Sequence, residues 1–285
     1  MMDAIETTTN VRELLESSPA GTVHSVYERT VNLSFSGRLV ALQTDGSPVS
    51  PISVILPARP DGMAAFAPGE GAECAAGPGA IRIGGKTIRI APETRIFDPY
   101  LPPHSAPHAA APEFAAAVRR IILRSGRSGF ARLVTKDLAS ADDPVLRYAS
   151  AAIDSAVDRF RSGDPAGCAK ELRRVIGLGQ GLTPSGDDFI CGVFAGMTAV
   201  YGEHPLLRPL RDEVAGHLGD TPDISAAFLR CALTGLFSKP VRQLFAAEDP
   251  EPLLPEFLAV GHSSGIDTLC GVLWLLSLPG RAGSN

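Results

Sequence analysis

One segment of the sequence concentrates residue types that can bind an anion or exchange a proton. Residues 179–188 read Gly-Gln-Gly-Leu-Thr-Pro-Ser-Gly-Asp-Asp, and Gly177 precedes them. Thr183 suits the cap of a helix and Pro184 its first turn, where the missing N–H group costs nothing. Unbonded N–H groups at such a helix start, with Gly186 leaving the first turn open, attract phosphate or carboxylate. The segment therefore predicts an anion site at a helix start, with Gly179, Gly181, Thr183, Ser185 and Gly186 as its candidate ligands.

Two acids in this segment change what it can hold. Asp187 and Asp188 would repel a bare anion, so they call for a divalent metal, a proton or a hydrogen-bond donor opposite them. No Gly-Lys-Ser/Thr follows, as a Walker loop requires, and the glycines do not form the dinucleotide-binding fingerprint after a strand. A capped helix start with ordinary surface acids is the alternative interpretation.

A second segment repeats the pattern. Residues 264–272 read Ser-Gly-Ile-Asp-Thr-Leu-Cys-Gly-Val and match residues 185–193 at six of nine positions. In each copy an aspartate stands four residues before a glycine, so both lie on one helix face. Glycine lets another backbone approach closely, at a cost of about 1 kcal/mol relative to alanine. We expect the two helices to pack through these faces, with Asp188 and Asp267 converging; coincidence, or a packing device without chemistry, remains open.

Two further loops resemble helix starts. Residues 221–225 read Thr-Pro-Asp-Ile-Ser, which repeats the capping pattern, and ordinary capping explains it as well. Residues 261–265 read Gly-His-Ser-Ser-Gly, where His262 can donate to an anion or act as a base near neutral pH. A solvated loop histidine is the alternative, and no Ser-His-Asp triad follows from the spacing.

These observations define the predicted site. The candidate catalytic residues are His262, Asp187 and Asp188. Further candidate residues for binding an anion or substrate are Thr221, Ser225, Ser263, Ser264 and Asp267. If a divalent metal binds, Asp187, Asp188 and Asp267 are its ligands; no other cofactor is expected.

The elements that carry these loops fall into two regions. Residues 20–97 contain short alternating or β-branched runs, and Gly84-Gly85 joins two of them as a two-residue hairpin loop. Residues 98–112 contain five prolines, which resist helix and sheet interiors. Beyond them apolar residues recur at helical spacing, and proline repeatedly precedes the run. The sequence predicts an α+β protein, with a small antiparallel β barrel or sandwich in residues 1–108 and an α-helical domain in residues 109–285.

The strands are expected at residues 21–33, 37–43, 51–56, 80–83 and 86–90. The helices are expected at residues 113–125, 144–161, 165–176, 184–201, 205–218, 222–237, 240–246 and 264–278.

Composition narrows the classes of protein. The chain has 285 residues, 45% of them apolar, and 26 basic against 31 acidic residues give a net charge of −5. With no basic run, nucleic acid and anionic membrane surfaces are not expected as partners. The start of the chain lacks a signal-peptide pattern, and no apolar stretch is long enough to span a bilayer. Five scattered cysteines without a CxxC motif indicate reduced thiols in the cytoplasm.

The motifs resemble those of a known family. Residues 177–189, Thr221 with Ile224-Ser225, residues 261–267 and the run Ser25-Val-Tyr-Glu-Arg-Thr-Val-Asn32 are similar to the AllH family, and the likeness extends over nearly the whole chain. The resemblance implies a subunit of an oxamate carbamoyltransferase in anaerobic allantoin breakdown, a branch of purine catabolism. Such a subunit works with an acyl-CoA-synthetase-like subunit and a third protein to interconvert oxalurate plus phosphate with oxamate plus carbamoyl phosphate. The resemblance does not identify a catalytic residue in this sequence.

Three functions follow from these features. The first is a carbamoyltransferase subunit that holds a small anionic substrate or carbamoyl phosphate at paired helix starts, since held phosphate and preorganised N–H groups stabilise such a transfer. The second is a non-catalytic, anion-binding scaffold subunit of a multi-protein complex. The third is a stand-alone enzyme that uses a nucleotide phosphate.

Overall fold

The computed structural model describes residues 1–58, 62–63, 66, 68–77, 79–126, 129–135 and 143–278. The chain divides into two compact units, one formed by Met1–Tyr100 with Phe237–Lys239, the other by Leu101–Leu236 with Pro240–Asn285. The division at Tyr100 falls inside the proline-rich segment. Residues after it join the helical unit, because the N–H groups of His104 and Ala106 donate to the carbonyls of Thr198 and Ala199.

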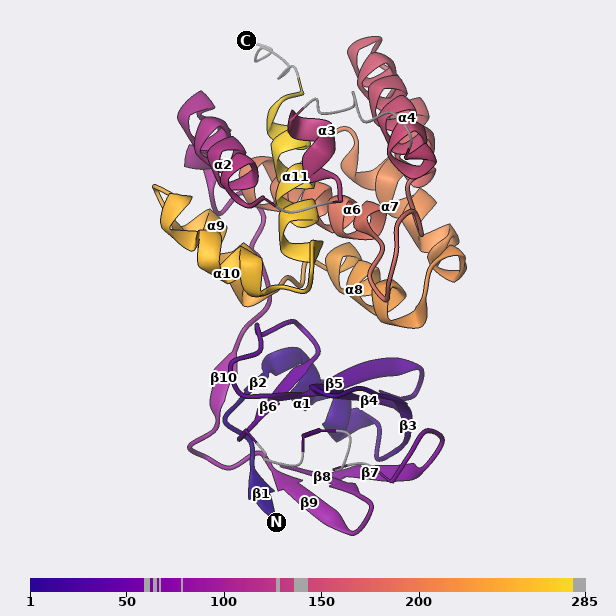
Figure 1. The fold of residues 1–285 in the computed structure, drawn as a ribbon, viewed down its shortest axis with the longest axis vertical. Helices are drawn as coiled ribbons and strands as arrows, with labels where there is room; N and C mark the ends of the chain where they lie inside the picture. Colours follow the sequence, from indigo (N-terminus) through magenta and orange to yellow (C-terminus); the bar gives the residue numbers. More distant parts are fainter. Residues whose placement is uncertain are drawn as a thin grey trace. The chain divides into compact units, whose positions relative to one another are not determined.

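The N-terminal unit is built on one curled sheet (Figure 1). Its strands follow the order β1-β9-β8-β7-β3-β4-β5-β6-β2-β10. Their bounds are β1 Met2–Asp3, β2 Glu6–Thr8, β3 Ala20–Val26, β4 Thr30–Phe35, β5 Arg38–Thr44, β6 Ser53–Leu56, β7 Glu73–Gly77, β8 Ala80–Ile83, β9 Lys86–Arg89 and β10 Arg95–Phe97. The predicted β region is therefore confirmed.

Purely antiparallel pairing is wrong for this sheet. The pairs β1–β9, β2–β10 and β5–β6 are parallel. The two short N-terminal strands pair with strands that lie more than 80 residues later, so no turn signal in the sequence could reveal them. The predicted Gly84-Gly85 hairpin does form, and both glycines adopt positive φ, as a two-residue turn of this hand requires.

Helix α1 (Thr9–Ser17) completes the core of this unit. It buries Val11, Leu14 and Leu15 against the strands, and the Thr8 hydroxyl accepts from the Val11 N–H at its start. A buried carboxylate joins the late segment 237–239 to the same unit, since Glu6 accepts from Lys239 Nζ at 2.8 Å. Residues far apart in sequence thus belong to one compact unit.

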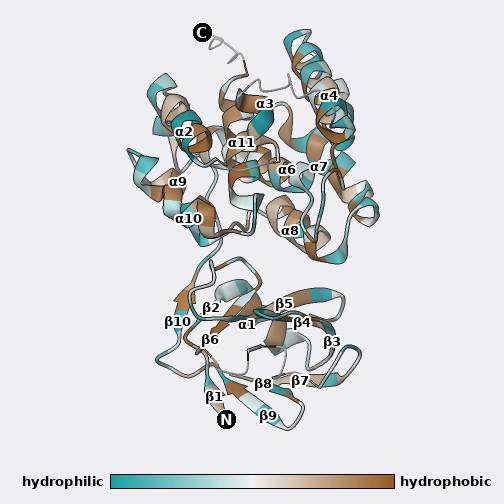
Figure 2. Cartoon of the chain, in the orientation of Figure 1, coloured by the Kyte–Doolittle hydropathy of each residue, from teal (hydrophilic) through white to brown (hydrophobic). Residues whose placement is uncertain are grey.

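The second unit is helical, as predicted. Its helices are α2 Pro112–Arg124, α3 Ala131–Thr135, α4 Pro144–Arg161, α5 Pro165–Arg173, α6 Ser185–Gly196, α7 Leu207–Gly216, α8 Asp223–Leu233, α9 Lys239–Ala246, α10 Leu254–Ala259 and α11 Ser264–Leu276, with short turns η1 Pro107–Ala110, η2 Met197–Tyr201, η3 Leu218–Asp220 and η4 Glu251–Leu253. Helix α11 contacts α2, α3, α6 and α10, and it is mostly hydrophobic along its length (Figure 2). Helices α6 and α11 form the centre of this unit.

Candidate functional site

Helices α6 and α11 meet backbone to backbone at two glycines. A Cβ atom at Gly192 would lie 1.9 Å from the carbonyl oxygen of Thr268, and one at Gly271 would lie 1.9 Å from that of Phe189. Gly192 and Gly271 are 79 positions apart, and so are Phe189 and Thr268, so each glycine receives the equivalent carbonyl of the other helix. The crossing expected from the two glycines is therefore present and reciprocal.

The helix starts differ from the predicted capping. α6 begins at Ser185 with Pro184 in the cap position, and α8 begins at Asp223 with Pro222 in the cap position. Thr183 and Thr221 stand one residue outside the predicted cap, and capping by these threonines is wrong. Their hydroxyls make tertiary bonds instead: Thr183 Oγ1 lies 2.9 Å from Ser264 Oγ, and Thr221 donates to Asp187.

The first turn of α6 is not open to a ligand. The Gly186 N–H donates to the Leu178 carbonyl, and a Cβ at Gly186 would lie 1.8 Å from the carbonyl oxygen of Val175. The N–H groups of Asp187 and Asp188 donate to the Pro184 carbonyl. The prediction that Gly186 exposes free N–H groups is therefore wrong, because this glycine allows close packing within the protein.

The glycine loop before α6 holds the donors that stay free. In the described part of the chain, the backbone N–H groups of residues 179–183 donate to no backbone carbonyl. Gly179 and Gly181 have φ values of 138° and 88°, and Gly181 is exposed with open space where a side chain would stand. Donors suited to an anion thus lie in the loop.

Asp187 is fully engaged inside the protein. It is 1% exposed, and it accepts from the Gly177 N–H at 2.9 Å, from the Ser225 hydroxyl at 2.6 Å and from the Thr221 hydroxyl. Burial raises the pKa of Asp187, and the three hydrogen bonds oppose that rise. Thr221 and Ser225 are therefore brought to Asp187, and together they tie the glycine loop to the start of α8.

Asp188 and Asp267 form a different arrangement, a pair of buried carboxyl groups with oxygens to spare. Asp188 is 9% exposed and Asp267 is fully buried. Asp188 is hydrogen-bonded by the Ser264 hydroxyl, and Asp267 by the hydroxyls of Ser185 and Ser263. The serine that starts each helix thus serves the aspartate of the other helix.

One oxygen of each carboxyl group has no partner. Asp188 Oδ2 and Asp267 Oδ2 are buried without a hydrogen bond, a state that they share, within the described residues, with Trp274 Nε1 alone. Leaving a buried acceptor unpaired costs about 1–3 kcal/mol. Natural proteins seldom do so without a functional reason or a bound group. The site is therefore characterised by two buried carboxyl oxygens that lack a hydrogen-bond donor.

Burial governs the charge of the pair. It raises the pKa of Asp188 well above the usual range, and the neighbouring charge of Asp267 adds to the effect. Burial also raises the pKa of Asp267, to about 6, although hydrogen bonds from Ser185, Phe130 and Ser263 stabilise its charged form. Asp267 is thus the member that ionises first.

A third segment reaches Asp267, and sequence reasoning missed it. The Phe130 N–H donates to Asp267 Oδ1 at 2.7 Å across 137 positions of the chain. Gly129 has a φ of 73°, and a Cβ there would lie 2.6 Å from the same oxygen. The glycine is the only local signal, and it does not name its partner.

His262 lies in the turn before α11 and is exposed. Ser263 is the cap residue of α11 but makes no capping hydrogen bond, since its hydroxyl serves Asp267. His262 therefore lies next in sequence to a residue that contacts the acid pair, without being part of the buried cluster.

The donor set does not fit the divalent metal that the sequence left open. In residues 1–278, apart from the undescribed gaps, no three His, Cys, Asp or Glu side chains are arranged to hold a metal ion. Asp187 is committed to three donors, which leaves two carboxylate oxygens where such ions take six or more ligands.

The pair predicts a pH dependence of folding. Because the pKa of Asp267 rises from 3.8 to about 6 on folding, the folded chain binds this proton more tightly. Its contribution to the free energy of unfolding is complete below about pH 4 and falls by about 3 kcal/mol as the pH passes about 6. Denaturant unfolding across this interval should show the fall, and Asp267→Asn should reduce it by about this amount, leaving the share of Asp188. A wild-type and variant difference that stays constant with pH would contradict the assignment.

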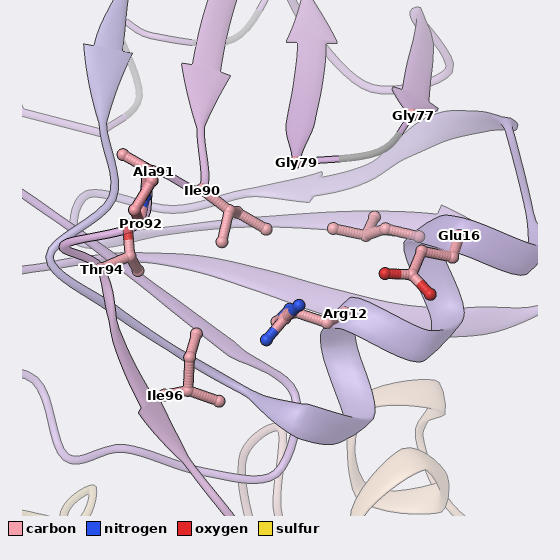
Figure 3. Close-up of a pocket in the computed structure, with 10 residues that line it drawn as sticks. Arg12, Glu16, Gly77, Gly79, Ile90, Ala91, Pro92, Thr94 and Ile96 are labelled. Atoms are coloured by element: carbon pink, nitrogen blue, oxygen red, sulfur yellow. The ribbon is translucent and has the colours of Figure 1, made fainter.

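A separate cavity of about 290 Å³ lies in the N-terminal unit, where α1 presents Arg12 and Glu16 opposite Ile90 and Ile96 (Figure 3). None of the predicted site residues lines it. Among the described residues, no helix is long and apolar enough to cross a membrane.

Two family models match the chain. The model of the AllH family N-terminal domain matches residues 3–95, and the model described as oxamate carbamoyltransferase subunit AllH matches residues 175–276. No solved structure matches the fold. The second match contains α6, α8 and α11 with the whole acid cluster, and a subunit family implies partners in a complex. On these two matches, and in agreement with its motifs, the chain belongs to the AllH family.

Proposed function

We propose that this chain is the substrate-binding subunit of an oxamate-type carbamoyltransferase, with its site at the starts of α6 and α11. The observation that carries the proposal is the pair of buried, unpartnered oxygens on Asp188 and Asp267, together with the preceding loop, whose N–H groups donate to no backbone carbonyl and whose Thr183 hydroxyl lies 2.9 Å from that of Ser264. Oxamate, oxalurate and carbamoyl phosphate each combine an N–H2 group with a carboxylate or phosphate. The site offers acceptors for the first and donors for the second.

Most of the predicted residues then have a role. Asp188 and Asp267 bind the carbamoyl or amide group, and Asp267 accepts its N–H hydrogens. The loop at Gly179 and Gly181, with His262, binds the anionic end, where donors held in place also stabilise developing charge. The hydroxyls of Thr183, Ser185, Ser263 and Ser264 orient the acid pair, and Asp187 with Thr221 and Ser225 holds the loop. The reciprocal contacts of Gly192 and Gly271 support the interpretation of the two helix starts as an internal repeat.

The proposal includes the assembly. The partners are an acyl-CoA-synthetase-like subunit and a third protein, as the family resemblance implies. Five cysteines that form no disulfide are consistent with a complex in the reducing cytoplasm.

The experiment measures phosphate release from carbamoyl phosphate and oxamate by the assembled complex. Asp267→Asn should lower the rate at least about tenfold, because it replaces the charged acceptor with an amide. Asp158→Asn, on the exposed face of α4, is the matched control and should leave the rate unchanged. A full rate for Asp267→Asn in a correctly assembled complex would overturn the proposal.

A non-catalytic scaffold is the second candidate, and one observation favours it: both unpartnered oxygens are shielded from solvent. A scaffold predicts that the partners retain their rate when they assemble with Asp267→Asn. The stand-alone nucleotide enzyme predicts turnover by this chain without partners. The same assay, run with the chain alone and with the complex, separates the three.

A further inference from the structure

The two helix starts bring the carboxyl groups of Asp188 and Asp267 close enough for their charges to interact. Each carboxyl group is hydrogen-bonded by the serine of the opposite helix start and keeps one buried oxygen unpartnered. The contacts of Gly192 and Gly271 fix the separation of the helices, because backbone atoms touch there and cannot approach further. The two acids are therefore held together by the crossing itself.

Two ionised carboxylates in such a place would repel each other and leave two acceptors empty. A single proton removes both difficulties, since an acid group beside a carboxylate gives one donor and one acceptor. We propose that Asp188 and Asp267 hold one proton in common and that this acid–carboxylate pair reads a primary amide or carbamoyl group. The protonated acid donates to the carbonyl oxygen of the ligand, and the carboxylate accepts from its N–H2 group.

The surroundings support one proton rather than two or none. Asp267 receives the Phe130 N–H and two serine hydroxyls, which favour its ionised form, whereas Asp188 has the Ser264 hydroxyl and the negative neighbours Asp187 and Asp267. This asymmetry assigns the proton to Asp188 and the charge to Asp267. Within the described residues, the thiols of half-buried Cys191 and buried Cys270, one turn further along each helix, also interact with the pair.

The pairing excludes the simplest alternative ligand. A dicarboxylate would bring two further acceptors to a pair that already carries a negative charge, so it would be repelled. An amide brings one acceptor and one donor, which match the pair without a net change in charge. The location of this ligand rests on the proposed function, whereas the shared proton does not.

Infrared spectroscopy of the full chain, with aspartate carboxyl groups labelled by ¹³C, tests the shared proton. At about pH 7 the carbonyl band of a protonated, buried carboxyl group should be present, although an ordinary aspartate is fully ionised there. The band should vanish in Asp188→Asn and persist in the control Asp158→Asn. Absence of the band at about pH 7 in the wild-type chain, or its survival there in Asp188→Asn, would overturn the shared proton. The wild-type titration decides this even where a variant fails to fold.

Binding of oxamate and of oxalate to the assembled complex tests the amide. Oxamate affinity should weaken about tenfold for each pH unit once the shared proton titrates, and in Asp188→Asn, whose amide donates permanently, this dependence should disappear. Oxalate should bind at least about tenfold more weakly than oxamate at about pH 7. Equal affinities with parallel pH dependence would overturn the amide reading. If the infrared band is present while the transfer assay is insensitive to Asp267→Asn, the proposed function fails and the shared proton stands.

Discussion

Replacing Gly192 with alanine is expected to destabilise the helical unit by about 4 kcal/mol or more. The new methyl group would lie 1.9 Å from the carbonyl oxygen of Thr268 and 3.0 Å from the N atom of Val272. These are backbone atoms of a buried helix, so no side-chain rotation relieves the overlap, and α6 and α11 must separate. Separation exposes apolar side chains of both helices and pulls Asp188 away from Asp267. Denaturant unfolding of the full chain, followed by circular dichroism, measures the loss.

Gly216 provides the matched control. It is the last residue of α7, and a Cβ there meets nothing within 4 Å. Gly216→Ala should change the free energy of unfolding by less than about 1 kcal/mol, because alanine favours a helix and nothing opposes it. Gly271→Ala should match Gly192→Ala, and the double variant should cost less than the sum, since one separation relieves both overlaps. A Gly192→Ala protein as stable as Gly216→Ala would contradict the crossing.

The helical half of the fold could be predicted because its signals are local. Prolines at residues 144 and 165 mark the first turns of α4 and α5, and Asp143 and Asp164 cap them through their side chains. α4 ends at Arg161, as its periodicity predicts. Apolar spacing and capping are properties of one segment, so one segment reveals them.

The sheet was harder to predict from the sequence, because its strands pair with strands that are distant in the chain. The predicted strand at residues 21–33 is two strands, divided by a turn in which the Tyr27 N–H donates to the Thr30 carbonyl. β10 was not predicted, because it is three residues long and, among the described strands, pairs with β2 alone, about ninety positions earlier. α1 was also missed, although Thr8 caps it, because the helix is short and buries one side against distant strands.

In the candidate site too, the local features could be predicted and the non-local contacts could not. The repeated Asp and Gly spacing placed α6 against α11 correctly, since each copy carries the pattern within nine residues. The hydrogen bonds from Thr221 and Ser225 to Asp187 could not be predicted, because these residues lie 34 and 38 positions from Asp187 in the sequence. The sequence pattern predicts the two helices. The hydrogen-bond partner of each hydroxyl depends on how the helices pack in the folded chain.

Asp187→Ala is expected to destabilise the helical unit by about 4 kcal/mol, because it strands three donors at once. The Gly177 N–H, the Thr221 hydroxyl and the Ser225 hydroxyl would lose their common acceptor, and Ser225 is 1% exposed, so water cannot replace it without a rearrangement. The glycine loop would also detach from the start of α8. Denaturant unfolding gives the global effect, and hydrogen exchange at the Gly177 amide gives the local one.

Asp212→Ala on the exposed side of α7 is the matched control and should stay within about 0.5 kcal/mol of the wild type. Asp187→Asn separates charge from geometry. Its amide oxygen can still accept from Gly177, and the two hydroxyls can rotate to accept from its N–H2 group, so it should cost about half as much as alanine. If Asp187→Asn instead left the fold intact and abolished carbamoyl transfer, the carboxylate would act on substrate rather than on the loop. A loss of stability with faster exchange at Gly177 assigns Asp187 to holding in place the donors that an anion would meet.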